Sequence, residues 1–347
     1  MTTTASRPVS PSVPPPTRST KHHRLVGLIA AFGIGTLVAV QSRVNGDLAT
    51  RLGDGIAAAL ISFWSGLLIL LVIAALSSRV RAALGRVWGT IRTPSGATRQ
   101  PGEQGLLRWW QCAGGVAGAF MVATQSITVG VIGVAVFIVA GVAGQAVSSL
   151  VVDRLGFGPA GPQAYTPTRV VGAVIAVAAV VLAVSDRLNH PAGLLLAVLP
   201  ALAGVGSAVQ QAINGRVART ASPDAYGAVA AAVVNFLVGS AALTVVFLID
   251  LVLRGAPHPL PTEPWLYVGG ACGVAFISLA ASVVRVVGVF VLGLGTIAGQ
   301  LIGSLFVDLF LPATDQGVTW PVVTGTLLAL LAVVVAALPN QRRLIRA

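Results

Sequence analysis

The sequence has little charge, few aromatic residues and only two cysteines. Charged residues make up 9% of the 347 residues, and aromatic residues make up 6%. Because a soluble domain carries about 25% charged residues, this composition excludes a chain whose whole surface faces water. The cysteines, Cys112 and Cys272, both lie in apolar stretches. We interpret them as small helix-packing residues rather than as a disulfide or a pair of metal ligands.

Several motifs of ATP-driven and catalytic proteins are missing as well. The chain has no GxxxxGK[ST] loop, so it is not expected to use ATP directly. It has no HExxH motif and no Cys/His ligand set. Its histidines lie in the N-terminal tail and in loops: His22, His23, His190 and His258. A Ser/His/Asp set cannot be placed at one depth in a membrane. We therefore predict no enzymatic activity, no metal and no cofactor.

Positive charge is in excess, with 22 Lys and Arg against 10 Asp and Glu and a net charge of +12. In a soluble protein this excess would suggest nucleic acid as a partner. In a membrane protein it marks cytoplasmic loops, where Lys and Arg collect. Arginine greatly outnumbers lysine, and Ala, Gly and Val are abundant, which is typical of a GC-rich bacterial genome. We predict a bacterial plasma-membrane protein without a nucleic-acid partner.

Long apolar runs are abundant. Hydrophobic residues make up 55% of the chain, and the mean hydropathy is +0.88. A transmembrane helix needs about 20 apolar residues, and polar or Gly/Pro segments divide the chain into ten such runs. They cover about 24–42, 56–76, 107–128, 129–152, 168–185, 192–212, 226–253, 265–284, 286–310 and 320–338. The predicted fold class is an all-α polytopic membrane protein with ten transmembrane helices.

The two ends of the chain differ from these runs. Residues 1–23 are rich in Ser, Thr and Pro, which predicts a disordered cytoplasmic tail, and residues 339–347 form a basic cytoplasmic tail. The first apolar run follows a long basic segment and lacks a convincing small-residue cleavage site. We therefore expect a retained transmembrane span rather than a signal peptide.

The two halves repeat the same motifs in the same order. An Ala-Val-Gln segment followed by Asn-Gly occurs at 39–46 and again at 208–215, and an Ala-Gly-Gln segment leading to Ser-Leu and Asp occurs at 143–153 and 298–308. Between these motifs, further Phe, Trp and Gly residues match. The pairs are Phe63 with Phe236, Gly66 with Gly239, Trp110 with Trp265, Gly114 with Gly269, Gly115 with Gly270, and Gly118 with Gly273. We predict one five-helix repeat over 24–186 and a second over 191–338.

The distribution of Lys and Arg predicts how these repeats are inserted. If the N-terminus is cytoplasmic, all but four of the 22 basic residues fall on the cytoplasmic side, and the outer side keeps Arg43, Arg51, Arg187 and Arg254. The positive-inside rule therefore favours cytoplasmic N- and C-termini. Because each repeat has five spans, the second is then inserted upside down relative to the first. Such inverted-topology repeats are common in secondary transporters, with the substrate near mid-membrane.

Amides inside the apolar runs form the first candidate binding set. Gln41 and Asn45 are four residues apart and share a helix face; Gln210 and Asn214 repeat them. Polar side chains within a membrane usually face the bundle interior or a water-filled cavity. Amides both donate and accept hydrogen bonds, which favours a neutral polar or zwitterionic solute. The alternatives are links between helices or caps at helix ends near the membrane surface.

A second set spaces Gln, Ser and Asp at i, i+4 and i+8. It consists of Gln145, Ser149 and Asp153 in the first half and of Gln300, Ser304 and Asp308 in the second. We predict that the Gln and Ser residues contact the solute. Inverted insertion places Asp153 at the cytoplasmic end and Asp308 at the outer end. Each is either a gating or protonation site or a solvated charge at a helix end.

We expect the four paired glutamines to converge on one central cavity. Gln145 and Gln300 lie eight residues, or about 12 Å, inside their Asp ends. Gln41 and Gln210 are placed close to helix ends by the expected span boundaries.

These paired motifs resemble the drug/metabolite transporter superfamily, which has ten spans in two five-span repeats. More narrowly, they resemble the YdcZ family of bacterial inner-membrane exporters. The resemblance rests on segments 41–46, 59–66, 143–153 and 298–308 and covers about 25–338. It implies export by alternating access across the plasma membrane. Small multidrug exporters of this superfamily carry a glutamate in the first span for proton coupling. The expected first and sixth spans here contain no carboxylate, so proton-coupled export of a cation is not expected.

Taken with the residues, this resemblance predicts a secondary transporter, embedded in the lipid bilayer, that exports a small metabolite or drug-like solute. A homodimer is an open alternative to a monomer. Two other functions remain: a flippase-like protein that translocates a lipid or amphiphile, and a membrane scaffold without transport. A polar cavity at mid-depth would favour solute transport, a lateral opening between helices would favour lipid, and a solid core would favour a scaffold.

Overall fold

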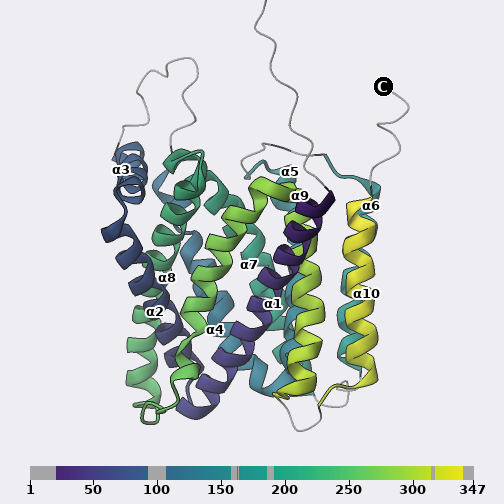
Figure 1. Ribbon diagram of the computed structural model, residues 1–347. Coiled ribbons are helices and arrows are strands. Elements are labelled where there is room, and N and C mark those ends of the chain that lie inside the picture. Colours follow the sequence, from purple (N-terminus) through teal and green to yellow (C-terminus); the bar gives the residue numbers. More distant parts are fainter. Residues whose placement is uncertain are drawn as a thin grey trace, which may run out of the picture.

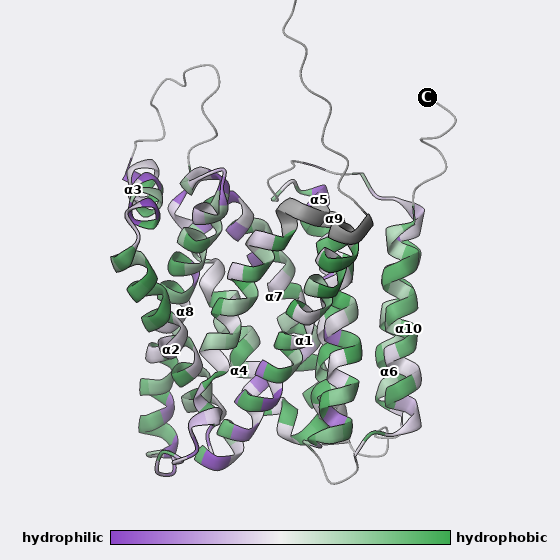
Figure 2. Ribbon diagram, viewed as in Figure 1, coloured by the Kyte–Doolittle hydropathy of each residue, from purple (hydrophilic) through white to green (hydrophobic). Residues whose placement is uncertain are grey.

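The computed structural model describes residues 21–92, 107–157, 162, 164–185, 191–313 and 317–338. These residues form a helical bundle, with no strand in the described ranges (Figure 1). Eight of the described helices are long and apolar enough to cross a membrane. Figure 2 shows hydrophobic residues along the length of the bundle and hydrophilic residues gathered toward its two ends. The two predicted tails lie outside the described residues, apart from 21–23, where the first helix begins.

The helices of the first half follow the predicted apolar runs, with one addition. Their bounds are α1 Lys21–Leu52, α2 Gly55–Leu76, α3 Ser78–Arg92, the short 3₁₀ helix η1 Trp109–Cys112, α4 Gly114–Ile132, α5 Val134–Arg154 and α6 Pro167–Ala183. Asp54 caps α2 by accepting hydrogen bonds from two backbone amides. Gly133, with φ of 81°, makes the tight turn between α4 and α5, a few residues after the predicted boundary at 128–129.

In its described residues, the second half contains four long helices and one short one. They are α7 Pro191–Ala221, α8 Ala225–Arg254, the 3₁₀ helix η3 Pro264–Tyr267, α9 Gly269–Phe310 and α10 Trp320–Ala337. The added element of the first half, α3, lies in what we predicted to be a cytoplasmic loop. It is a short amphipathic helix whose Val80, Ala83 and Val87 are buried, and it packs against α7 and α8. A search for long apolar runs cannot find such a helix, because its apolar residues recur only once per turn.

Helix α9 turns back on itself. At 42 residues a straight helix would be about 63 Å long, twice the hydrocarbon core of about 30 Å. Yet Gly269, at its start, packs against Asn45 of α1, and the carbonyl of Leu311, just past its end, accepts a hydrogen bond from Arg43 of α1. Both ends therefore lie beside the same part of α1, and Figure 1 shows the helical ribbon rising and then descending. The break expected near Arg285 is a turn in continuously helical backbone.

The bundle has two faces, which we name by their residues. The α3 face carries α3, the start of α1 and the end of α10 (Figure 1); there Arg86 of α3 donates to the Ala221 carbonyl at the end of α7. The Arg43 face is the opposite end, where Arg43 contacts Leu311 and where Arg51 pairs with Glu263.

Close contacts between the two halves come in pairs. A contact of a glycine in the first half with a residue of the second half recurs at the matching positions with the two halves exchanged. A methyl group on Gly144 would collide with the Ala201 carbonyl, and one on Gly299 would collide with the Phe32 carbonyl. These pairs occupy matching repeat positions, and glycine allows such close helix approach. The same exchange relates Gly35–Thr296 to Gly204–Gly141, Gly66–Phe236 to Gly239–Phe63, Gly115–Asn235 to Gly270–Ser62, and Gly172–Ala332 to Gly325–Ala179. Matching residues of the two halves thus exchange partners across the bundle.

Candidate functional site

A central cavity of about 440 Å³ lies among α1, α2, α4, α5, α7, α8 and α9. The four paired glutamines line it, each from a different helix: Gln41, Gln145, Gln210 and Gln300. All four side chains are half-buried. The structure thus brings these amides together as their spacing led us to expect. Their contact with a solute remains a prediction.

Three of these amides are not used by the protein itself. Gln41, Gln145 and Gln300 make no side-chain hydrogen bond within the part of the chain that the structure describes. Gln210 differs, because its Nε2 donates to Asn235 Oδ1 at 3.0 Å. A polar group away from water needs a partner, so the three free amides are available to water or to a solute in the cavity.

The rest of the cavity wall is largely apolar, with a few uncharged polar groups. No charged side chain lines it among the described residues; besides the glutamines, hydroxyl and amide groups come from Ser62, Ser207, Gln211, Asn214, Asn235 and Thr296. The rings of Phe63 and Phe236, which occupy matching positions, also line the cavity and contact each other with centroids 5.0 Å apart. Such a wall can hydrogen-bond a neutral or zwitterionic solute and cover its apolar part.

Toward the Arg43 face, a buried group of polar side chains lies behind the wall. Asn45 Nδ2 donates to Gln125 Oε1 at 2.9 Å, and Gln125 Nε2 donates to Ser42 Oγ. All three side chains are at most 2% exposed. Asn45, which we expected to contact the solute, does not line the cavity and instead connects α1 to α4. Its Oδ1 has no hydrogen-bond partner among the described residues.

The matching positions toward the α3 face have the opposite environment. Ser42, Asn45 and Gln125 correspond in the second half to Gln211, Asn214 and Ala280, and these three residues line the cavity. Asn214 also donates to Asn235 Oδ1 at 3.2 Å. The cavity therefore extends toward the α3 face and is closed by buried side chains toward the Arg43 face.

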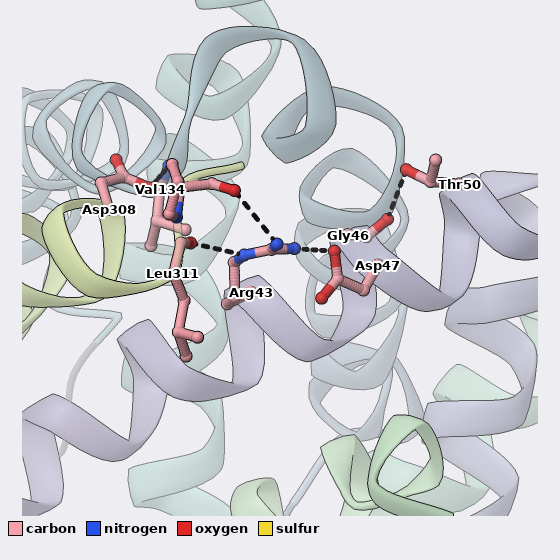
Figure 3. Close-up of polar contacts among 8 residues, drawn as sticks. Arg43, Gly46, Asp47, Thr50, Val134, Asp308 and Leu311 are labelled. Carbon is pink, nitrogen blue, oxygen red and sulfur yellow. Dashed lines mark hydrogen bonds and ion pairs between the residues drawn. The ribbon is translucent and has the colours of Figure 1, made fainter. Parts of the chain in front are cut away.

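Asp308 belongs to a contact network at the Arg43 face (Figure 3). Its carboxylate accepts hydrogen bonds from the backbone amides of Val134 at 3.0 Å and Ala135 at 2.7 Å. Asp308 therefore caps the start of α5, where Gly133 offers no side chain to do so. With 7% exposure, Asp308 is not a solvated helix-end charge.

Arg43 joins the same network. Its Nε donates to Leu311 O at 2.8 Å and its Nη2 donates to Pro312 O at 3.2 Å, while Nη1 forms an ion pair with Asp47 (Figure 3). The network links α1 to the segment that follows α9.

Asp153 lies at the other end of α5 in a more open environment. Its side chain is 35% exposed and pairs with Arg169 of α6. The neighbouring Arg154 instead lies over the ring of Tyr165, 5.8 Å from its centroid. Because Asp308 caps the start of α5 and Asp153 is near its end, the two matching carboxylates lie at opposite ends of the bundle.

The comparison with known families identifies the family of this chain. Residues 26–182 and 195–335 match the family model described as "Putative inner membrane exporter, YdcZ". The chain belongs to the YdcZ family. The search of curated proteins found no match. The family assignment confirms the resemblance of the motifs and supports a multi-pass inner-membrane protein with a role in export.

In this YdcZ-family chain, the two predicted serines lie outside the central cavity. Ser304 is fully buried, and its hydroxyl donates to the Leu301 carbonyl of its own helix. Ser149 likewise donates to the Ala146 carbonyl and lines a second cavity. Because a serine hydroxyl can bond the preceding turn of its own helix, Ser at a polar spacing does not by itself indicate a solute contact.

The first and sixth spans of this YdcZ-family chain are longer than predicted. Helices α1 and α7 continue to Leu52 and Ala221, so Gln41 and Gln210 lie well inside their helices, not near the ends. Asp47 therefore belongs to α1, where its ion pair with Arg43 offsets both charges. The expectation of a first span without a carboxylate was wrong for this reason.

Some cavity residues were not among the predicted site residues. Gln211, Ser207 and Thr296 line the cavity, and Ser207 and Thr296 lie one turn before Gln210 and Gln300. A search along the same helix face, three or four residues from each predicted glutamine, would have found Ser207 and Thr296.

Proposed function

We propose that this chain is a ten-span secondary transporter that exports a small neutral or zwitterionic metabolite or drug-like solute by alternating access. The observation that carries the proposal is the central cavity, in which four glutamines from four helices meet without any charged side chain among the described residues. Membership of an inner-membrane exporter family supports the same role.

Ten spans are supported by two shorter apolar helices beside the eight longer candidates. These are Pro167–Ala183, which is α6, and Gly269–Ala280, the first part of α9. Since both ends of α9 lie at the Arg43 face, this helix accounts for two crossings. The second crossing, Val291–Phe310, is already among the eight.

The contacts between the halves support an inverted repeat. Matching residues exchange partners across the bundle, and the matching Asp153 and Asp308 lie at opposite ends of α5. An axis along the membrane normal would instead place matching residues at equal depth. A two-fold axis in the membrane plane accounts for both observations.

Charge supports a cytoplasmic α3 face. Arginines gather there. Arg79, Arg81, Arg86 and Arg92 lie on α3, and Arg154, Arg169 and Arg216 lie near ends of α5, α6 and α7. The Arg43 face carries fewer, and Arg43, Arg51 and Arg254 each pair with a carboxylate there. The positive-inside rule then favours cytoplasmic N- and C-termini.

Alternating access is supported by the difference between the two sides of the cavity. Toward the Arg43 face, the Asn45–Gln125 pair and the contacts of Arg43 close the path. Toward the α3 face, the matching Asn214 lines the cavity. If the halves exchanged these arrangements, the cavity would open to the other side. A cavity reached from the cytoplasm is the state in which an exporter takes up its solute.

Untargeted metabolomics of culture medium tests the function directly. A deletion strain is compared with strains that express the wild-type chain or Gln145→Leu. We expect at least one neutral or zwitterionic metabolite to rise in the medium with the wild type, and export to fall at least about tenfold in Gln145→Leu, since a lost polar contact of about 1.4 kcal/mol gives that factor.

The matched control is Thr324→Val. Thr324 lies on the exposed side of α10 and bonds only the Trp320 and Pro321 carbonyls of its own helix, so this variant should export like the wild type. Equal export by Gln145→Leu, at equal protein level, would contradict the role of the cavity. A medium in which no metabolite depends on the chain would contradict export itself.

A further inference from the structure

A second cavity, of about 220 Å³, lies among α5, α6, α9 and α10; we call it the α6/α10 cavity. Gln145 and Ile297 line both this cavity and the central one, so they form the wall between them. Its remaining walls are apolar and mostly small, and include Ala146, Gly172, Ala173, Ala176 and Ala332. Arg169 and Ser149 also line it. The ion pair between Arg169 and Asp153 places this end of the cavity at the α3 face.

The cavity follows from the residue types of the first half. Ala146 and Ala173 correspond to Leu301 and Thr326 in the second half, and Arg169 corresponds to Val322. Leu301 and Thr326 are fully buried and Val322 is 3% exposed, so larger side chains fill the matching region. The cavity at this matching region, beside Asp308 and Val322, has a volume of only about 10 Å³. An exchange of arrangements between the halves therefore cannot produce the same cavity at the Arg43 face.

The chemistry of the walls indicates an amphiphile with a negative charge. The long apolar wall suits an acyl chain, whose burial stabilises by about 0.8 kcal/mol per methylene group. Arg169 uses Nη2 for Asp153, and a guanidinium has five N–H donors, so donors remain for an anionic group. Arg154 and Arg216 lie at the same end of the bundle, where Arg216 bonds the Gly156 carbonyl. This end of the bundle carries more arginines than carboxylates among the described residues, which favours an anion there.

We propose that the α6/α10 cavity binds the acyl chain of an anionic amphiphile, with its carboxylate or phosphate at Arg169. The ligand class covers a free fatty acid and an acidic phospholipid of the leaflet at the α3 face. This site is separate from the central cavity and does not depend on the exported solute. Because Gln145 belongs to both walls, the bound chain contacts the same residue that faces the central cavity.

Binding of the fluorescent fatty acid cis-parinaric acid to the purified full-length chain in neutral detergent tests the proposal without any transport assay. Ala146→Leu and Ala173→Thr introduce the residues of the filled counterpart. Each should weaken binding by roughly tenfold, because the larger side chain fills the space that a few methylene groups of the ligand would occupy. The control Ala178→Leu lies on the exposed side of α6 and should bind like the wild type. Thermal unfolding checks that all variants are folded.

The role of Arg169 is tested by competition with decanoate and with decanol. In Arg169→Gln, the inhibition constant of decanoate, corrected for the weaker binding of the anionic probe, should rise roughly tenfold. The corrected inhibition constant of decanol, which has no charge, should stay as in the wild type. Asp153→Asn leaves Arg169 charged but removes the carboxylate that pairs with it, so the binding of decanoate should become stronger. Unchanged binding in both Ala146→Leu and Ala173→Thr would overturn the proposed site, and an equal loss for decanoate and decanol would overturn the headgroup contact.

The two sources of the ligand are separated with nanodiscs. If nanodiscs of phosphatidylglycerol displace the probe and those of phosphatidylcholine do not, the occupant is an acidic phospholipid. If both leave the probe bound while decanoate displaces it, the occupant is a free fatty acid. Displacement by both nanodiscs to the same extent would overturn the requirement for negative charge.

Discussion

Asn45 and Asn214 occupy matching positions in the two halves, yet their surroundings differ. Asn45 is fully buried and bonds Gln125, whereas Asn214 lines the central cavity and bonds Asn235. The carboxylates differ in a similar way, because Asp308 caps a helix in the interior and Asp153 forms a partly exposed ion pair. The difference teaches that a repeated residue keeps its place in the repeat but not its environment. A carrier that is open to one face at a time requires such a difference.

The largest difference between the two halves is expected in the chemical accessibility of matching positions. In a background with both native cysteines replaced by alanine, Gln211→Cys should react with a membrane-impermeant maleimide, and Ser42→Cys should not, because position 42 is buried behind the cavity wall. In inverted membrane vesicles the cytoplasmic side faces the added reagent. Reaction of Gln211→Cys in these vesicles, but not in intact cells, would support the proposed orientation. Similar reactivity of both positions would show that the two sides do not differ.

Next in size is the loss of the Asp308 cap. Asp308→Ala leaves the amides of Val134 and Ala135 without their charged partner, so the free energy of unfolding should fall by about 3 kcal/mol. Thermal or denaturant unfolding in detergent measures this. Asp308→Asn keeps one acceptor and should lose about half as much. If Asp308→Ala unfolds like the wild type, the carboxylate does not stabilise the start of α5.

Smaller changes are expected at the paired asparagines. Asn45→Ala removes the partner of buried Gln125 and should lower the free energy of unfolding by about 1–2 kcal/mol. Asn214→Ala should cost less than about 0.5 kcal/mol, since its side chain faces the cavity and water can replace it. Export should fall in Asn214→Ala at unchanged protein level. Equal destabilisation by the two variants would remove the contrast between the halves.

The smallest effect is expected at the Asp153–Arg169 pair. Both side chains are about one-third exposed, and exposed pairs contribute about 0–1 kcal/mol. Asp153→Ala should therefore change the unfolding temperature far less than Asp308→Ala does. A loss as large as that of Asp308→Ala would mean that the two carboxylates stabilise the fold equally, and that their different burial has no consequence.

Much of this molecule could be predicted from local sequence. The apolar runs predicted a helical membrane protein. The spacing of Gln145 and Gln300 placed both on the central cavity with Gln41 and Gln210. These predictions succeeded because apolar length and residue spacing along one helix are local properties. Ten spans and an inverted repeat remain proposals.

The tertiary structure decided what depends on distant partners. Whether Asn45 faces solute or protein depends on Gln125, which lies 80 residues away, and the cap on α5 comes from Asp308 of the other half. The turn within α9 and the α6/α10 cavity also depend on which helices pack together. The sequence by itself determined which residues are repeated and lie within the membrane. Only packing decided which copy is buried, because the two halves can meet in more than one arrangement without any change in their local pattern.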